Sequence, residues 1–116
     1  MISFMSNSEL ALKTILLSIE KIIHYSSSSK SADDFYHDSK SFDATMIHFI
    51  NIGEMIERID LSTKENYPSV PWQNVKDFRN IVAHNYFGID AEEIWEIIND
   101  HLPAFKIQIQ TILKTI

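Results

Sequence analysis

Hydrophobic residues near the start of the chain recur at the spacing of one face of an α-helix. The positions concerned are Leu12, Ile15, Leu16, Ile19, Ile22 and Ile23. Their i, i+3, i+4, i+7 pattern predicts an amphipathic helix over about residues 6–25. Ser6, followed three residues later by Glu9, has the pattern of a capping box at the helix start. The serine run at residues 26–29 favours a turn or loose linker, because serine hydroxyls compete for backbone hydrogen bonds.

A second apolar stripe predicts a helix over about residues 39–59. It consists of Phe42, Met46, Phe49, Gly53 and Ile56. A short helical segment opened by Ser31 is expected before it, with a break near residues 36–39. Gly53 in the middle of the helix costs on the order of 1 kcal/mol relative to alanine, so we expect another helix to approach closely there.

Residues 60–71 are predicted to form a loop between the second and third helices. Pro68 and Pro71 favour an extended backbone, and Pro71 is well placed at or just before a helix start. The third helix is expected over about residues 72–85, before the helix breaker Gly88. Its apolar face consists of Trp72, Val75, Phe78 and Val82.

A fourth apolar stripe begins after the helix cap Asp90 and continues to the end of the chain. Its members are Ile94, Ile98, Leu102, Phe105, Ile109, Ile112 and Ile116. Pro103 predicts a kink or break within this helix. Because four stripes must be buried and no strand-like alternation occurs, the sequence predicts an all-α, up-and-down helical bundle.

The composition narrows the class of protein further. With 116 residues, the chain is expected to form a single domain over residues 1–116, and only 2 glycines and 3 prolines favour long helices. The absence of cysteine excludes a disulfide framework, a thiolate zinc site and a cysteine nucleophile. The histidines at positions 24, 37, 48 and 101 lack metal-ligand spacing, so no metal site is expected.

The hydropathy of the chain predicts a cytoplasmic protein. No apolar run is long enough to cross a membrane, and residues 1–10 lack the character of a signal peptide. The net charge of -6 disfavours broad, non-specific binding of nucleic acid. An RNA substrate stays compatible with this charge, because a local basic patch on a dimer can bind a phosphate.

Arg79, His84 and Tyr86 form the most unusual cluster in the sequence. Residues seven apart on a helix lie nearly on one face, which places Arg79 and Tyr86 together, whereas His84 is rotated from Arg79 by about 140°. One helix therefore does not direct the guanidinium and the imidazole to the same point. Two copies that cross at a symmetric dimer interface would bring both pairs around one cleft.

These side chains suit metal-independent transesterification of an RNA backbone. His84 can accept and return a proton near neutral pH, and Arg79 can stabilise the charge that develops on a phosphate. Asn80 can bind the substrate or orient a partner side chain. From spacing alone an alternative stays open, in which Arg79, His84 and Tyr86 only cap helix carbonyls and complement the helix dipole.

The pattern R-x4-H-x-Y, formed by Arg79, His84 and Tyr86, resembles the signature of HepT-like toxins of the HEPN superfamily, which are encoded beside a minimal nucleotidyltransferase called MntA. Further segments extend the resemblance along most of the chain. They are N-I-G-E at 51–54, V-P-W at 70–72, and F-G-I-D at 87–90 followed by Trp95.

The resemblance implies a small all-helical domain that dimerises so that two motifs face one cleft. In the family the arginine and histidine of the motif are the ribonuclease residues, which correspond to Arg79 and His84, and Asn80 matches the polar residue after the arginine. Tyr86 matches the tyrosine to which the partner nucleotidyltransferase transfers AMP from ATP, which silences the toxin. The chain itself then needs no cofactor, and a larger hetero-oligomer with the antitoxin is expected.

Two questions stay open from the sequence. Glu54 either reaches the cleft and pairs with Arg79, or it belongs to a solvated stripe with Glu57 and Arg58. The function also has alternatives: a non-catalytic helical module that docks or presents substrate to a nucleotidyltransferase, or a purely structural bundle. The sequence does not identify the RNA that is cut or the stoichiometry with the partner.

Overall fold

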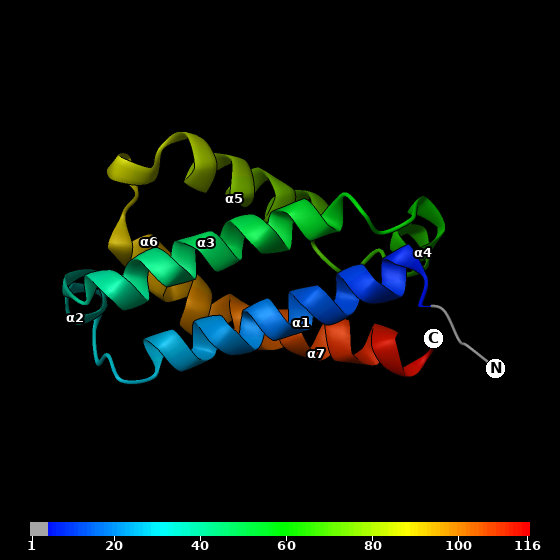
Figure 1. The fold of residues 1–116 in the computed structure, drawn as a ribbon, viewed down its shortest axis with the longest axis horizontal. Coiled ribbons are helices and arrows are strands. Elements are labelled where there is room, and N and C mark those ends of the chain that lie inside the picture. The colour runs from blue at the N-terminus through cyan, green and yellow to red at the C-terminus, as the bar shows by residue number, and fades with distance from the viewer. Residues whose placement is uncertain (1–4) are drawn as a thin grey trace.

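Four long helices run up and down the long axis of the molecule in the computed structural model, which describes residues 5–116 (Figure 1). They are α1 (Asn7–Ser26), α3 (Ser39–Ile56), α5 (Trp72–His84) and α7 (Leu102–Lys114). Helix α1 packs against α3 and α7, and α3 also packs against α5. The described residues contain no β-strand and extend over 48 × 26 × 22 Å. The all-α, up-and-down bundle predicted from the sequence is therefore confirmed.

Helix α1 is capped as the sequence predicts. The Ser6 hydroxyl accepts a hydrogen bond from the backbone N–H of Glu9 at 3.0 Å. The helix ends one residue later than expected, at Ser26, whose hydroxyl donates to the Ile22 carbonyl at 2.9 Å. The chain then leaves helical hydrogen bonding over residues 27–31, where the remainder of the serine run lies.

The expected break before α3 lies at Asp38, directly after the short helix α2 (Ala32–His37). The Asp38 side chain accepts a hydrogen bond from the Ser41 N–H at 3.3 Å and so caps α3. At its other end α3 stops at Ile56 rather than at residue 59, because the next N–H groups bond to carbonyls three residues back and tighten the last turn.

The prediction of a loop over residues 60–71 is wrong in its first half, which forms the short helix α4 (Leu61–Asn66). Asp60 caps this helix by accepting a hydrogen bond from the Thr63 N–H at 2.8 Å. None of the residues of α4 is buried. A helix that buries nothing shows no apolar periodicity, which explains why the hydrophobic pattern did not reveal it.

The kink that Pro103 predicts is a single π-helical turn, η2 (Ile97–His101), which separates α6 (Ala91–Glu96) from α7. Proline has no N–H for the carbonyl four residues earlier, and its ring crowds that carbonyl. The preceding turn is correspondingly wide, since the Leu102 N–H donates to the Ile97 carbonyl five residues back.

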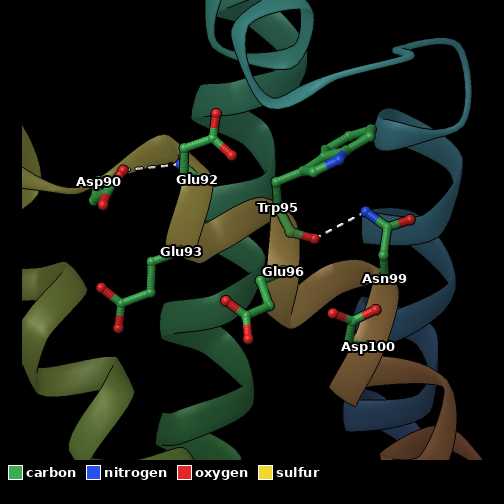
Figure 2. A pocket seen from close by; sticks show the side chains of 7 residues that line it. All are labelled: Asp90, Glu92, Glu93, Trp95, Glu96, Asn99 and Asp100. Atoms are coloured by element: carbon green, nitrogen blue, oxygen red, sulfur yellow. Dashed lines mark hydrogen bonds between the residues drawn. The ribbon is translucent and has the colours of Figure 1, made fainter.

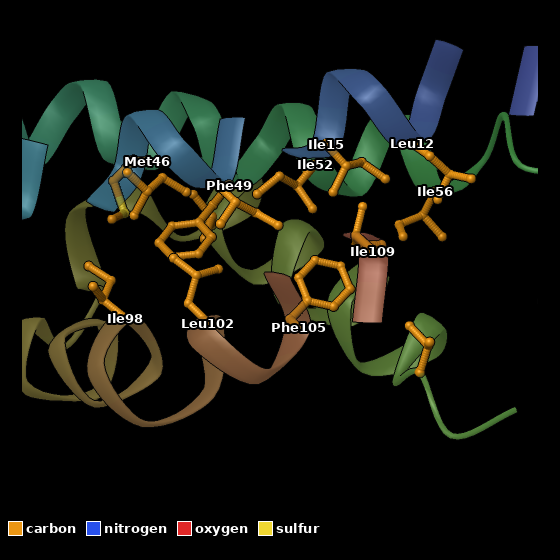
Figure 3. Packing of buried hydrophobic residues seen from close by; sticks show 14 of the residues in the cluster. Leu12, Ile15, Met46, Phe49, Ile52, Ile56, Ile98, Leu102, Phe105 and Ile109 are labelled. Atoms are coloured by element: carbon orange, nitrogen blue, oxygen red, sulfur yellow. The ribbon is translucent and has the colours of Figure 1, made fainter. Parts of the chain in front are cut away.

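The apolar stripes of the long helices meet in one hydrophobic core (Figure 3). Its most buried members include Leu12, Ile15, Ile19, Met46, Ile52, Ile109 and Ile112. Trp72, which the sequence places on the apolar face of its helix, and Trp95 both lie half-buried against this core. Ile116 departs from its expected place in the stripe, because α7 ends at Lys114 and Ile116 is exposed.

None of the helices within residues 5–116 combines the length and the apolar character that a membrane span requires. Residues 1–4, which belong to the segment expected not to be a signal peptide, lie outside the described residues.

Candidate functional site

The motif residues lie on the last turns of α5 and on the turn that follows. Helix α5 ends at His84, with Asn85 as its C-terminal cap. Tyr86 begins a short 3-10 turn, η1 (Tyr86–Gly88). The expectation that Arg79 and Tyr86 share one helix face is therefore wrong, because the helix stops before it reaches Tyr86.

Arg79 is held in place by hydrogen bonds from both ends of its guanidinium fork. One terminal nitrogen, Nη2, donates to the Glu54 carboxylate of α3. The other, Nη1, donates to the Asn80 Oδ1 at 2.7 Å, and Nε is buried with no partner among residues 5–116. Of the two alternatives for Glu54, the ion pair with Arg79 is the one formed. The hydrogen bond between Asn80 and Arg79 is compatible with one of the two roles expected for Asn80, the orientation of another side chain.

Gly53 explains how Arg79 can lie so close to α3. A Cβ atom at Gly53 would overlap the Cβ and Cγ atoms of Arg79. The absence of a side chain at position 53 therefore lets the aliphatic stem of Arg79 rest directly on the α3 backbone. The close approach of another helix, which the mid-helix glycine predicts, is confirmed, and the approaching group is the motif arginine itself.

His84 lies on a different side of α5 from Arg79. Both residues belong to the regular part of the helix, so their five-residue separation corresponds to a rotation of about 140° and a rise of about 7.5 Å. The His84 side chain is exposed and forms no hydrogen bond with any other of the residues 5–116. Ile81, one turn earlier on the same side, is 52% exposed, and Phe87 beyond the helix end is fully exposed.

Tyr86 contacts α3 through both its ring and its hydroxyl. The hydroxyl donates a hydrogen bond to the Asp43 carboxylate, and the ring lies edge-on to Phe42 with centroids 6.5 Å apart. Burial of the phenol and its hydrogen bond to Asp43 raise the pKa of Tyr86 to about 12. Asp43 was not predicted as a site residue, because nothing in the local sequence relates it to a tyrosine on a different helical segment.

An acidic hollow of about 400 Å³ lies along α6 and η2 (Figure 2). It is lined by Asp90, Glu92, Glu93, Trp95, Glu96, Asn99 and Asp100. Its carboxylates repel phosphate groups, so it does not suit an RNA backbone. Across residues 5–116, no group of three or more acidic or histidine side chains is placed to hold a metal ion.

A second hollow, of about 340 Å³, is apolar and opens between α3, α5 and the segment formed by η2 and α7. Its lining includes Phe49, Val75, Phe78, Leu102 and Phe105. Neither hollow contains Arg79 or His84. The motif of a single chain thus lies outside both of these cavities, on the surface made by α3, α5 and η1.

Comparison with known proteins gives a family match over most of the chain. The family described as ribonuclease HepT-like matches residues 15–112. A protein of Methanocaldococcus jannaschii named "Putative RNase" is 31% identical over 102 residues, which are 88% of this chain and 84% of that relative. "Probable ribonuclease HepT" of Thermococcus cleftensis is 28% identical over 82 residues, which are 71% of this chain and 74% of that relative.

A larger relative contains a matching region. It is a protein of Methanocaldococcus jannaschii named "Gamma-glutamylcyclotransferase and putative RNase", 33% identical over 103 residues. The match covers 89% of this chain and 46% of the relative, so this chain spans less than half of that protein. No solved structure gives a significant match.

Proposed function

The chain belongs to the ribonuclease HepT-like family, and on this premise we propose that it is the toxin of a cytoplasmic toxin–antitoxin pair. Its activity is metal-independent cleavage of RNA at a composite site that two copies of the chain form together. A minimal nucleotidyltransferase of the MntA type is its antitoxin, and the two proteins assemble into a larger hetero-oligomer. The chain uses no cofactor of its own, whereas the partner uses ATP.

One observation supports the proposal. Hydrogen bonds to Glu54 and Asn80 hold the Arg79 guanidinium in position, whereas His84 is exposed on another side of the same helix. A single α5 cannot direct both side chains at one phosphate. A two-fold axis that runs beside the exposed side of α5 places the His84 of one copy near the Arg79 of the other. The exposed apolar residues Ile81 and Phe87 supply hydrophobic area for such a contact.

At this site His84 and Arg79 contribute to different parts of the transesterification. His84 accepts the proton of the ribose 2′-hydroxyl as its oxygen attacks phosphorus, and an imidazolium protonates the departing 5′-oxygen. The new 2′-O–P bond replaces the P–O5′ bond, which leaves a cyclic phosphate and a free 5′-hydroxyl. Arg79 stabilises the charge that grows on the phosphate oxygens, because its planar fork matches their geometry.

An AMP group on Tyr86 inactivates this site through its position beside the cleft and its negative charge. Tyr86 follows the catalytic histidine by two residues and lies directly after the end of α5. An AMP group on its oxygen adds a bulky nucleotide and a negative phosphate beside the cleft, where it blocks and repels the RNA backbone. The silenced form is therefore expected to keep its fold and to lose RNA binding.

The ribonuclease proposal is tested by incubating the purified chain with RNA in the presence of EDTA. We expect cleavage by the wild type, and a loss of about 10²–10⁴-fold in rate for Arg79→Ala and His84→Ala. Arg58→Ala and His24→Ala are matched controls at exposed positions and are expected to leave the rate unchanged. If the chain binds the nucleotidyltransferase but cuts no RNA, the alternative of a non-catalytic presenting module replaces the enzyme.

The modification is tested separately by mass spectrometry after incubation with ATP and the nucleotidyltransferase. Each transferred AMP is expected to add about 329 Da to the wild-type chain. Tyr86→Phe is expected to abolish the gain, whereas Tyr36→Phe, which alters an exposed tyrosine on α2, is expected to preserve it. An unchanged wild-type mass contradicts the proposed silencing.

A further inference from the structure

Asp43 lies in the second turn of α3 and accepts the hydrogen bond of the Tyr86 hydroxyl. The contact joins two segments that are 43 residues apart in the sequence. Phe42, the neighbour of Asp43, packs against the edge of the Tyr86 ring and fixes the direction of the phenol. The hydroxyl proton of Tyr86 therefore points at a carboxylate of the same chain before any partner arrives.

We propose that Asp43 is the general base that takes this proton when Tyr86 receives an AMP group. This role of Asp43 rests on the proposed modification of Tyr86. It places the general base on the chain that receives the AMP group rather than on the nucleotidyltransferase. Asp43 is exposed, so an ATP-bearing partner can approach the Tyr86 oxygen while the carboxylate keeps its contact.

The reaction balances with ATP as the only co-substrate. The Tyr86 oxygen attacks the α-phosphorus of ATP and forms the new O–P bond. The bond between the α-phosphorus and the bridging oxygen breaks, and pyrophosphate leaves with its electron pair. The phenol proton moves to the Asp43 carboxylate as the new bond forms, because the oxygen becomes strongly acidic only at that stage.

The environment of Tyr86 makes such an acceptor necessary. A tyrosine is already a neutral phenol at physiological pH, and burial, together with the neighbouring carboxylate, raises the pKa of Tyr86 further, to about 12. A neutral phenol attacks phosphorus poorly unless a base removes its proton during the attack. Asp43 supplies that base and holds the oxygen in one orientation.

The test compares substitutions that separate basicity from hydrogen bonding. Asp43→Asn keeps an oxygen that can accept the hydrogen bond but removes the basic carboxylate, whereas Asp43→Ala removes both. Asp43→Glu restores a carboxylate at a longer reach. Asp33→Asn is the matched control, because Asp33 is an exposed aspartate whose carboxylate forms no hydrogen bond or ion pair within residues 5–116.

The measurement is the initial rate of mass gain with saturating ATP, magnesium and the partner nucleotidyltransferase, recorded from pH 6 to pH 9. For Asp43→Asn we expect a loss of about 10²-fold or more in kcat, with little change in KM for ATP. The ratio of the variant rate to the wild-type rate is expected to rise with pH, because hydroxide then replaces the missing base. Asp43→Glu is expected to recover part of the rate, and Asp33→Asn is expected to match the wild type.

The outcomes distinguish this proposal from the one on which it rests. If the wild type gains no mass, the modification itself is overturned, and the role of Asp43 is overturned with it. If the wild type is modified and Asp43→Asn is modified equally fast at every pH, only the role of Asp43 is overturned. Equal losses in the Asn, Ala and Glu variants with no dependence on pH also overturn it, since they indicate a positional role.

Discussion

Gly53 on α3 and Arg79 on α5 lie so close that a methyl group at position 53 would overlap the Cβ and Cγ atoms of the arginine. The next residue of α3, Glu54, binds the guanidinium of the same arginine. Two adjacent residues of α3 thus position the Arg79 side chain. Gly53 leaves room for its Cβ and Cγ atoms, and the Glu54 carboxylate binds its guanidinium. The segment Ile52-Gly53-Glu54 and the motif arginine therefore contact each other directly in the folded chain.

Gly53→Ala is expected to lower both the stability of the bundle and its ribonuclease activity. Overpacking at a close helix contact costs about 1–3 kcal/mol, which exceeds the gain of about 1 kcal/mol that alanine brings to a helix interior. Urea unfolding measures the difference. The loss is expected to persist in an Arg79→Ala background, because the introduced alanine keeps the Cβ atom of the contact. A more stable Gly53→Ala protein would contradict the close approach.

Tyr86 is expected to titrate at a higher pH than an ordinary tyrosine. Its pKa is raised to about 12 from the ordinary value of 10.0. Its contribution to stability is therefore complete below about pH 10 and is lost as the pH rises through about 12. Tyrosinate absorbance of the folded protein measures the titration. Tyr86→Phe should remove the last step and Asp43→Asn should move it to lower pH. A wild-type titration with all tyrosines near the ordinary value would refute the effect of partial burial and of the Asp43 contact on Tyr86.

His48 is expected to make the bundle less stable as the solution becomes mildly acidic. Burial, together with the nearby Lys21, lowers the pKa of His48, whose Nδ1 lies 3.2 Å from the Ser18 hydroxyl. The neutral imidazole is thus favoured in the folded state. Its stabilising contribution is present above the ordinary pKa of 6.5 and is lost as the pH falls through the lowered folded value. Urea unfolding between pH 8 and pH 5 should show a smaller decrease for His48→Gln.

The control for this titration is His24→Gln, since His24 is exposed on the same helix as Ser18. Its unfolding free energy is expected to follow the wild-type pH dependence. A His48→Gln protein with the same slope as the wild type would show that His48 does not contribute to it.

Ile81→Glu is expected to weaken the association of two copies and, with it, the cleavage of RNA. Ile81 is 52% exposed on the side of α5 that carries His84, so a charge there opposes a hydrophobic contact without entering the core. Light scattering and RNA cleavage measure the two effects. Leu61→Glu is the matched control, because Leu61 is 69% exposed on α4 at the opposite end of the molecule (Figure 1). Unchanged mass and activity for Ile81→Glu would place the interface elsewhere.

Hydrophobic periodicity predicts the four long helices because each buries a stripe in the shared core. The same signal is absent from α4, which buries none of its residues, so a loop was predicted there instead. Gly53 also indicates the close approach of another helix, because a glycine within a strong helix pattern is unfavourable unless the packing requires it. Its partner Arg79 could not be identified in this way, since segments so far apart in the sequence meet only through the packing of α3 on α5.

The position of Tyr86 shows a second limit of reasoning from helical spacing. Extending the α5 helix by two residues places Tyr86 on the same face as Arg79, but the helix ends at His84 and Tyr86 begins a 3-10 turn. That turn carries Tyr86 to Asp43 near the start of α3. The rotation between Arg79 and His84 is correctly predicted because both residues lie within the helix.

Arg79 and His84 are proposed to act together across two copies of the chain, and mixed dimers show whether they do. Arg79→Ala and His84→Ala proteins, each inactive alone, are unfolded together, refolded and assayed for RNA cleavage. Random pairing makes about half of the dimers mixed, and each mixed dimer has one intact arginine and one intact histidine on opposite copies. The mixture is predicted to recover about a quarter to a half of wild-type activity. A mixture as inactive as either variant alone would contradict a shared site.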